Sequence, residues 1–194
     1  MPILCDTSSI LMLIRIAPEM FLNESYDCYT IKEVWEEMFQ TTKFKNKYPW
    51  RVNFKKNIKI LPSTIGKKKS FKKSLDSINA LLDYSYVENK RTKRLFSISF
   101  IDRRVIAYAL ECKYKVSSTD VSMIDFAVQN FQSEFKGAIS PLGIINQFLE
   151  KGLIKWTDEH HNFLSDWKYQ EEPSQPNEEI IRFKRLTRKD YPGL

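Results

Sequence analysis

The residues best suited to chemistry are aspartates placed where a predicted helix begins. Asp6 follows the apolar run Ile3-Leu4-Cys5, Asp102 closes the capping-box spacing that Ser99 opens, and Asp120 stands before another helical run. Each has an ordinary structural explanation, because aspartate caps helices and complements their N-termini. Several carboxylates gathered at one edge would repel one another unless a cation were bound. Their joint placement therefore indicates a candidate metal site.

Short buried strands and amphipathic helices alternate around these acids. The predicted strands are 2–5, 26–29, 57–62, 114–117 and 138–140, and the predicted helices begin near residues 7, 30, 71, 99, 120 and 141. Helix, strand and helix in succession imply a parallel sheet, whose ligands bind outside the carboxyl ends of the strands. The predicted class is α/β, with the aspartates at that edge.

A glutamate could join them from the helix that begins near Thr30. Thr30-Ile31-Lys32-Glu33 has the capping-box spacing, which gives Glu33 a structural role. Glu36 and Glu37 both lie off the centre of the apolar stripe. The helical period alone therefore does not choose between them.

Composition narrows the class of protein. With 194 residues, 42% of them hydrophobic, the chain can bury a core as one domain with appendages. Cys5, Cys28 and Cys112 lack a C-x-x-C spacing, so neither a disulfide framework nor a zinc site is expected. No apolar run is long enough for a membrane span, and the first residues lack signal-peptide features. We expect a cytoplasmic protein without a membrane partner.

The net charge of +7 is unevenly distributed, because no acidic residue occurs between Glu37 and Asp76. This basic segment favours a polyanion such as a nucleic acid. Aromatic residues within it could stack on single-stranded bases: Phe44, Tyr48, Trp50, Phe54 and Phe71. The alternative is a solvated lysine face with the aromatics in the core. The predicted RNA-binding residues are Lys67, Lys68, Lys69, Lys72 and Lys73.

Four motifs occur in an order that resembles a known family. Residues 3–8, ILCDTS, are similar to a hydrophobic-Asp-Thr/Ser-Ser start, and residues 34–38, VWEEM, are similar to V-x-x-E-L, which selects Glu37. Asp102 leads an alanine-containing helix, and residues 118–120, STD, are similar to T-x-D. The chain thus resembles, over about residues 1–156, the PIN domain family of metal-dependent ribonucleases, which includes VapC-type toxins.

The resemblance implies a Rossmann-like α/β/α sandwich with a central parallel sheet. The chain departs from compact members of the family in a longer basic segment and in a short C-terminal extension. The domain would span 1–156, with a basic insertion at about 40–95, and 157–194 would form a polar extension ending in a basic tail, with a linker-like stretch at 171–179. The implied catalytic acids are Asp6, Glu37, Asp102 and Asp120. The implied ligands of Mg²⁺ or Mn²⁺ are Asp6, Asp102 and Asp120, with Asp125 as a fifth acid, and Ser8 and Ser118 would orient carboxylates.

The implied activity is hydrolysis of RNA phosphodiester bonds. An antitoxin-like protein partner and a homodimer would also be in keeping with the resemblance. His160 and His161 lie in the polar C-terminal part and are not expected to bind the metal. The number of ions and the choice between RNA and DNA stay open. The alternative is a PIN-like module that binds RNA or protein without catalysis. A nucleotide-binding Rossmann protein is disfavoured, because no G-x-G-x-x-G follows the first strand.

Overall fold

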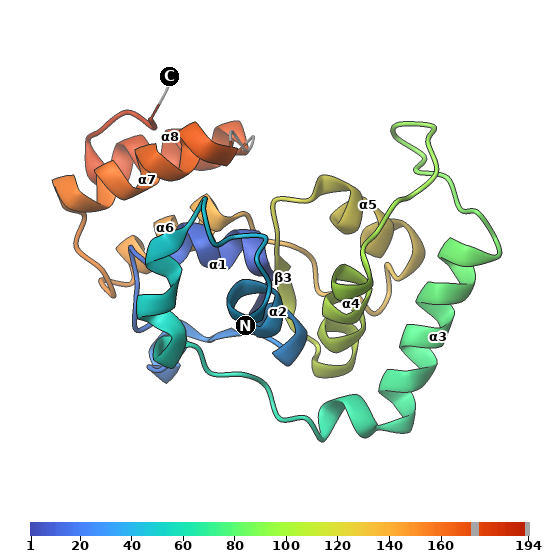
Figure 1. Cartoon of the computed structure of the whole chain (residues 1–194). Coiled ribbons are helices and arrows are strands. Elements are labelled where there is room, and N and C mark those ends of the chain that lie inside the picture. Colours follow the sequence, from blue (N-terminus) through green and yellow to red (C-terminus); the bar gives the residue numbers. More distant parts are fainter. Residues whose placement is uncertain (172–174, 193–194) are drawn as a thin grey trace.

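The computed structural model describes residues 1–171 and 175–192, and it is an α/β protein built around a small parallel sheet (Figure 1). The strands are β1 (Ile3–Cys5), β2 (Cys28–Tyr29) and β3 (Lys115–Ser117), in the order β2-β1-β3. The α-helices are α1 (Thr7–Leu13), α2 (Lys32–Gln40), α3 (Lys69–Asp83), α4 (Phe100–Cys112), α5 (Val121–Asn130), α6 (Pro141–Glu150), α7 (Asp158–Glu171) and α8 (Asn177–Thr187). Short 3-10 helices cover Glu24–Tyr26, Pro49–Asn57 and Ile65–Lys67.

The parallel register brings the ends of β1 and β3 to one edge. Cys5 pairs with Ser117, so Asp6 and Ser118 both leave the sheet there. All of β1 is buried, as expected of parallel strands covered on both faces. In Figure 1, β3 lies between α1 and α6 on one side and α4 on the other. The predicted α/β class and parallel pairing are therefore confirmed.

Two predicted strands are reduced to single bridges at the borders of the sheet. Ile60 pairs with Thr30, and Ala138 pairs with Val116. Pro62 and Pro141 follow shortly, and a proline cannot donate the next ladder hydrogen bond. Strands over the full ranges 57–62 and 138–140 were therefore wrong predictions, although both segments lie where a strand would extend the sheet.

The start of α2 also differs from the prediction. Its N-cap is Ile31, which makes no side-chain capping bond. The hydroxyl of the buried Thr30 instead donates to the backbone oxygen of Cys5 at 2.9 Å, and Glu33 forms an ion pair with Arg104. The capping box at residues 30–33 is wrong, because Thr30 is used by the sheet. The box at residue 99 is confirmed in its first half, since the Ser99 hydroxyl accepts from the Asp102 N–H at 3.2 Å.

The C-terminal segment, expected to be a polar extension, forms α7 and α8, which pack on the rest of the chain. α7 contacts α1 and α8 contacts α6, in the upper left of Figure 1. Leu164 and Phe183 are completely buried, and Trp167 is nearly so. The basic residues of the predicted tail lie in or just after α8. The linker-like stretch at 171–179 includes residues 172–174, which lie outside the described residues.

The aromatic residues of the basic segment belong largely to the core. Phe44, Tyr48 and Phe71 are buried, and Trp50 and Phe54 pack against the core while half-buried. Stacking of Phe44, Tyr48 or Phe71 on bases was therefore a wrong prediction, and the alternative of aromatics inside and lysines outside holds for them. Within the part of the chain that the structure describes, no helix is long and apolar enough to cross a membrane.

Candidate active site

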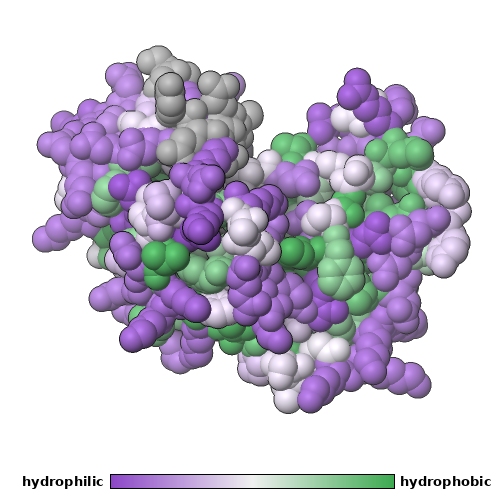
Figure 2. Space-filling view, viewed as in Figure 1, coloured by the Kyte–Doolittle hydropathy of each residue, from purple (hydrophilic) through white to green (hydrophobic). Residues whose placement is uncertain are grey.

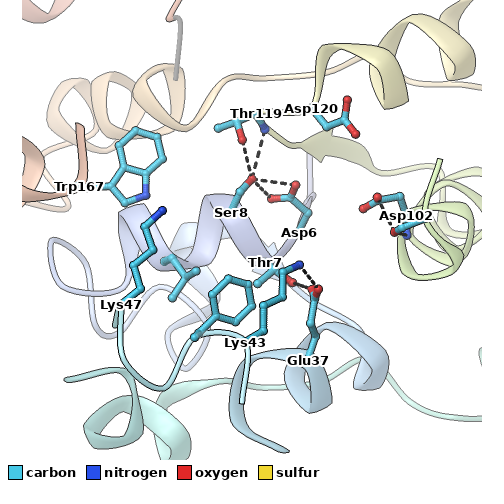
Figure 3. A pocket seen from close by; sticks show the side chains of 13 residues that line it. Asp6, Thr7, Ser8, Glu37, Lys43, Lys47, Asp102, Thr119, Asp120 and Trp167 are labelled. Atoms are coloured by element: carbon cyan, nitrogen blue, oxygen red, sulfur yellow. Dashed lines mark hydrogen bonds and ion pairs between the residues drawn. The ribbon is translucent and has the colours of Figure 1, made fainter. Parts of the chain in front are cut away.

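A pocket of about 540 Å³ lies at the carboxyl edge of the sheet, where α1, α4 and α5 begin. Asp6, Glu37, Asp102 and Asp120, the predicted catalytic acids, all line it (Figure 3). The remaining lining residues are Thr7, Ser8, Leu11, Lys43, Phe44, Lys47, Ser99, Thr119 and Trp167. Residues from distant parts of the sequence are thus brought together by the parallel topology.

Asp6 is the most deeply buried of the acids, with 6% of its surface exposed. It is the N-cap of α1, and its Oδ1 accepts from the Ser9 N–H at 2.7 Å. Its Oδ2 accepts from the Ser118 hydroxyl at 2.6 Å, and the Ser8 hydroxyl lies 2.9 Å from both carboxylate oxygens. Burial raises the pKa of Asp6, while the hydrogen bonds from Ser118, Ser9 and Ser8 act in the opposite direction.

Ser8 and Ser118 connect Asp6 to the end of β3. Ser8 Oγ accepts from Thr119, both from the hydroxyl at 2.9 Å and from the backbone N–H at 3.3 Å. Ser118 Oγ accepts from the Asp120 N–H at 2.9 Å. Both serines therefore hold the Asp6 carboxylate and the β3–α5 turn in one hydrogen-bonded network.

Asp102 lies in the first turn of α4, and Asp120 is the N-cap of α5. Asp120 caps α5 by accepting from the N–H groups of Ser122 and Met123 at 2.8 and 3.2 Å. The pKa of Asp102 is raised to about 6, chiefly by burial and also by the negative charges of Asp6, Asp120 and Glu37. The hydrogen bond from the Ser99 hydroxyl acts in the opposite direction. The carboxyl of Asp102 is therefore close enough to the other three acids for their negative charges to disfavour its ionisation.

Glu37, and not Glu36, is the glutamate of this pocket. Its Oε2 accepts from the Thr7 hydroxyl at 2.5 Å, and its Oε1 forms an ion pair with Lys43 at 2.7 Å. Glu36 pairs at the surface with Lys32, one turn earlier, at 3.2 Å. Lys43 therefore places a cationic group inside a pocket that is otherwise acidic.

Asp125 does not line the pocket. Its Oδ2 accepts from Asn89 Nδ2 at 2.8 Å and forms an ion pair with Arg91 at 2.7 Å. His160 and His161 lie against Trp156, also outside the pocket. The structure therefore separates Asp125 from the other predicted ligands.

The predicted RNA-binding lysines also lie away from the acids. Lys68 pairs with Glu111, nine residues after Asp102 on α4, or about 14 Å along the helix. Lys69, Lys72 and Lys73 line a separate shallow groove along α3. The pocket instead contains Lys43 and Lys47.

Sequence reasoning missed Lys43, Lys47 and Trp167 as pocket residues. Figure 3 shows Lys47 and Trp167 on the side opposite Asp102 and Asp120. Trp167 arrives from α7, which the sequence analysis did not identify as a helix. The absence of acids after Glu37 was the one available signal for the lysines, but it did not distinguish two of them from the others.

The donor set suits a hard divalent cation in its chemistry, because carboxylate oxygens are the ligands that Mg²⁺ and Mn²⁺ prefer. The raised pKa of Asp102 also reflects negative charge that a cation would offset. Among the described residues, however, no three His, Cys, Asp or Glu side chains are arranged to hold a metal ion. An ion would have to draw the carboxylates of the pocket closer together.

In comparisons with protein-family models, curated proteins and solved structures, no match to the chain was found. A function for the pocket is therefore inferred from its geometry and its donor chemistry.

Proposed function

We propose that the chain is a metal-dependent endoribonuclease of the PIN type, with the α/β/α sandwich of that family. The observation that carries the proposal is the convergence of Asp6, Glu37, Asp102 and Asp120 on one pocket. A purely structural role does not require carboxylates from separate segments to share a pocket at the cost of mutual repulsion. The free thiols of Cys5, Cys28 and Cys112 fit a cytoplasmic location.

In this proposal Asp6, Asp102 and Asp120 hold Mg²⁺ or Mn²⁺. The bound ion would supply a water of lowered pKa and stabilise negative charge on the leaving oxygen. Glu37 orients the attacking water, and Ser8 and Ser118 keep the Asp6 carboxylate in place through their hydrogen bonds. Asp125 is left out of the ligand set, because Asn89 and Arg91 hold its carboxylate elsewhere.

Cations near the pocket would position the RNA. Lys43 and Lys47 line the pocket and are placed to meet the phosphates flanking the bond to be cleaved. The lysines at and before the start of α3 remain predicted RNA contacts at a greater distance: Lys67, Lys68, Lys69, Lys72 and Lys73. An antitoxin-like partner and a homodimer remain predictions that follow from the resemblance alone.

The alternative is a PIN-like module that binds RNA or protein without catalysis. The observation in its favour is the ion pair between Lys43 and Glu37, which supplies a protein cation to one of the acids. Such a module would bind RNA equally well with and without divalent metal and would leave the RNA intact.

Cleavage of a labelled single-stranded RNA by Asp6→Asn and Asp120→Asn variants tests the proposal. Each substitution should reduce metal-dependent cleavage by about 100-fold or more, since loss of residues that only support metal ligands already costs 10- to 100-fold. Asp190→Asn is the matched control, because Asp190 is exposed and pairs with Lys184 outside the pocket. Undiminished cleavage by Asp6→Asn would show that the pocket is not the active site.

A further inference from the structure

Residues 84–99, between α3 and α4, form an arm that projects at the upper right of Figure 1. Glu88 and Leu95 pair in an antiparallel bridge. Beyond this bridge, the Asn89 N–H donates to Arg94 O and the Lys93 N–H donates to Asn89 O, both at 2.8 Å. The arm is therefore a small hairpin whose tip is residues 90–94.

The tip is fixed to α5 by the side chains of Asp125 and Gln129. Asn89 is 4% exposed, and its Nδ2 donates to Asp125, which also pairs with Arg91. Gln129 Nε2 donates to Glu88 O at 2.8 Å, and Gln129 Oε1 accepts from the Lys90 N–H at 2.9 Å. These bonds restrain the tip against α5, and a restrained surface loses less conformational entropy when it binds a ligand.

The surface of the arm combines cations with exposed aromatic rings. Tyr84 and Tyr86 are 81% and 66% exposed. The tip carries the exposed cations Lys90, Arg91, Lys93 and Arg94, and Figure 2 shows the projection to be hydrophilic at its end. A surface that binds single-stranded nucleic acid needs aromatic rings on which bases can stack, and it needs cations that can contact phosphates. The buried aromatics of residues 44–71 do not meet the first requirement.

The arm is connected to the acidic pocket in two ways, through the chain that follows it and through α5. The arm ends at Ser99, which lines the pocket, and it is anchored on α5, which begins after Asp120. Gln129 lies nine positions after Asp120, or about 14 Å along the helix. A stacked strand advances about 3.4 Å per nucleotide, so about four nucleotides would connect the pocket to the arm.

We propose that this arm binds the single-stranded RNA on the α5 side of the pocket, an inference that rests on the proposed function. Tyr84 and Tyr86 stack on bases, and Lys90, Lys93 and Arg94 contact phosphates. Asp125 is then a positioning residue, since its carboxylate holds Asn89 and Arg91 and through them the tip of the arm.

RNA binding by the full chain in EDTA tests the arm separately from catalysis. Fluorescence anisotropy with a labelled 20-nucleotide single strand would compare wild type with Lys90→Glu/Lys93→Glu/Arg94→Glu. We expect at least tenfold weaker binding, and a salt dependence whose slope falls by about 2, or about 0.7 for each charge that contacts a phosphate. A second variant, Tyr84→Ala/Tyr86→Asn, should bind at least about fivefold more weakly through lost stacking. Asparagine suits position 86, where φ is 49°, in the left-handed region.

The matched control is Lys113→Glu/Lys151→Glu/Lys155→Glu. These exposed lysines follow the C-terminal ends of α4 and α6, away from the edge where both helices begin. The control changes the net charge equally and should bind within about twofold of wild type, since exposed sites outside an interface contribute little. Unfolding midpoints would establish that all variants are folded.

The outcomes separate the arm from the nuclease. If wild type and the control bind RNA and the arm variants do not, the result supports RNA binding by the arm. This holds even if no metal-dependent cleavage is found. Equal binding by the arm variants and wild type, or an equal loss in the control, overturns it, even if the protein cleaves RNA. Absence of RNA binding by wild type also overturns it.

Discussion

The hydroxyl of Ser118 donates a hydrogen bond to Oδ2 of Asp6 at 2.6 Å, although the two residues are 112 positions apart in the sequence. The Oγ of Ser118 also accepts a hydrogen bond from the Asp120 N–H at 2.9 Å. Ser118 thus joins the acid that follows β1 to the acid that follows β3. This link exists because Cys5 and Ser117 are paired in the sheet.

Replacing Ser118 should weaken the site without removing an acid. Ser118→Ala removes a hydrogen bond that lowers the pKa of Asp6, so this pKa should rise and the acid limb of the activity profile should shift to higher pH. Metal affinity should fall by about 10- to 100-fold. Mn²⁺ titration and a pH profile would measure both effects, and Ser118→Thr, which keeps a hydroxyl, should restore them. An unchanged pH profile in Ser118→Ala would contradict this role.

Asp102→Asn should stabilise the metal-free fold at neutral pH. The pKa of Asp102 in the folded chain, about 6, exceeds the ordinary value of an unfolded aspartate, so ionisation of this carboxyl destabilises the fold. This contribution lowers the free energy of unfolding as pH rises from about 4 to about 6. The variant should therefore be more stable than wild type by about 1–3 kcal/mol at pH 7 and by much less at pH 4.

Urea unfolding at pH 4 and pH 7 would measure this difference, with Asp190→Asn as the control at an exposed aspartate. Equal stability of wild type and Asp102→Asn at both pH values would show that burial and neighbouring charges do not destabilise the ionised carboxyl. Saturating Mn²⁺ should stabilise wild type, by about 2.7 kcal/mol at a concentration 100 times its Kd, and Asp102→Asn much less.

Lys43→Gln should increase the affinity for a divalent ion. Lys43 supplies positive charge to Glu37, and its removal leaves the pocket more negative. Because Lys43 is largely exposed, the gain should be modest, about two- to fivefold. Lys45→Gln, at an exposed position that does not line the pocket, is the control. Calorimetric titration with Mn²⁺ would decide, and weaker binding by Lys43→Gln would refute this electrostatic account.

The C-terminal helices should contribute to global stability. Leu164 on α7 is completely buried, whereas Ile181 on α8 is 70% exposed. Leu164→Ala should lower the free energy of unfolding by about 2–5 kcal/mol, and Ile181→Ala should change it by no more than about 0.5 kcal/mol. Denaturant unfolding of both variants would check this contrast. Similar small losses would mean that α7 is not part of the cooperative core.

The positions of Asp6 and Asp102 at the edge of the sheet could be predicted because the signals for them are local in the sequence. An apolar strand followed by Asp6, and a capping serine followed by Asp102, are features of short segments, and parallel pairing then brings such positions together. Thr30 shows the limit of local pattern, because its hydroxyl could cap α2 or bond to β1, and only the sheet decides.

The parts that the sequence did not reveal depend on tertiary packing. Lys43 reaches Glu37 through the path of the chain after α2, and Trp167 reaches the pocket only because α7 packs on α1. Asp125 was predicted only as an additional fifth acid, and its carboxylate instead binds Asn89 and Arg91 at the hairpin tip. The sequence spacing of Lys43, Trp167 and Asp125 does not show whether each side chain makes these contacts or faces solvent.

The most direct test of the acidic site is cleavage of a labelled single-stranded RNA by wild type and Asp102→Asn. Each metal-stripped protein would be assayed with Mn²⁺, with Mg²⁺ and with EDTA, with unfolding midpoints confirming that both are folded. We predict cleavage by wild type that requires the metal and disappears in Asp102→Asn. Metal-independent cleavage, equal cleavage by the variant, or intact RNA under every condition would contradict the proposed nuclease.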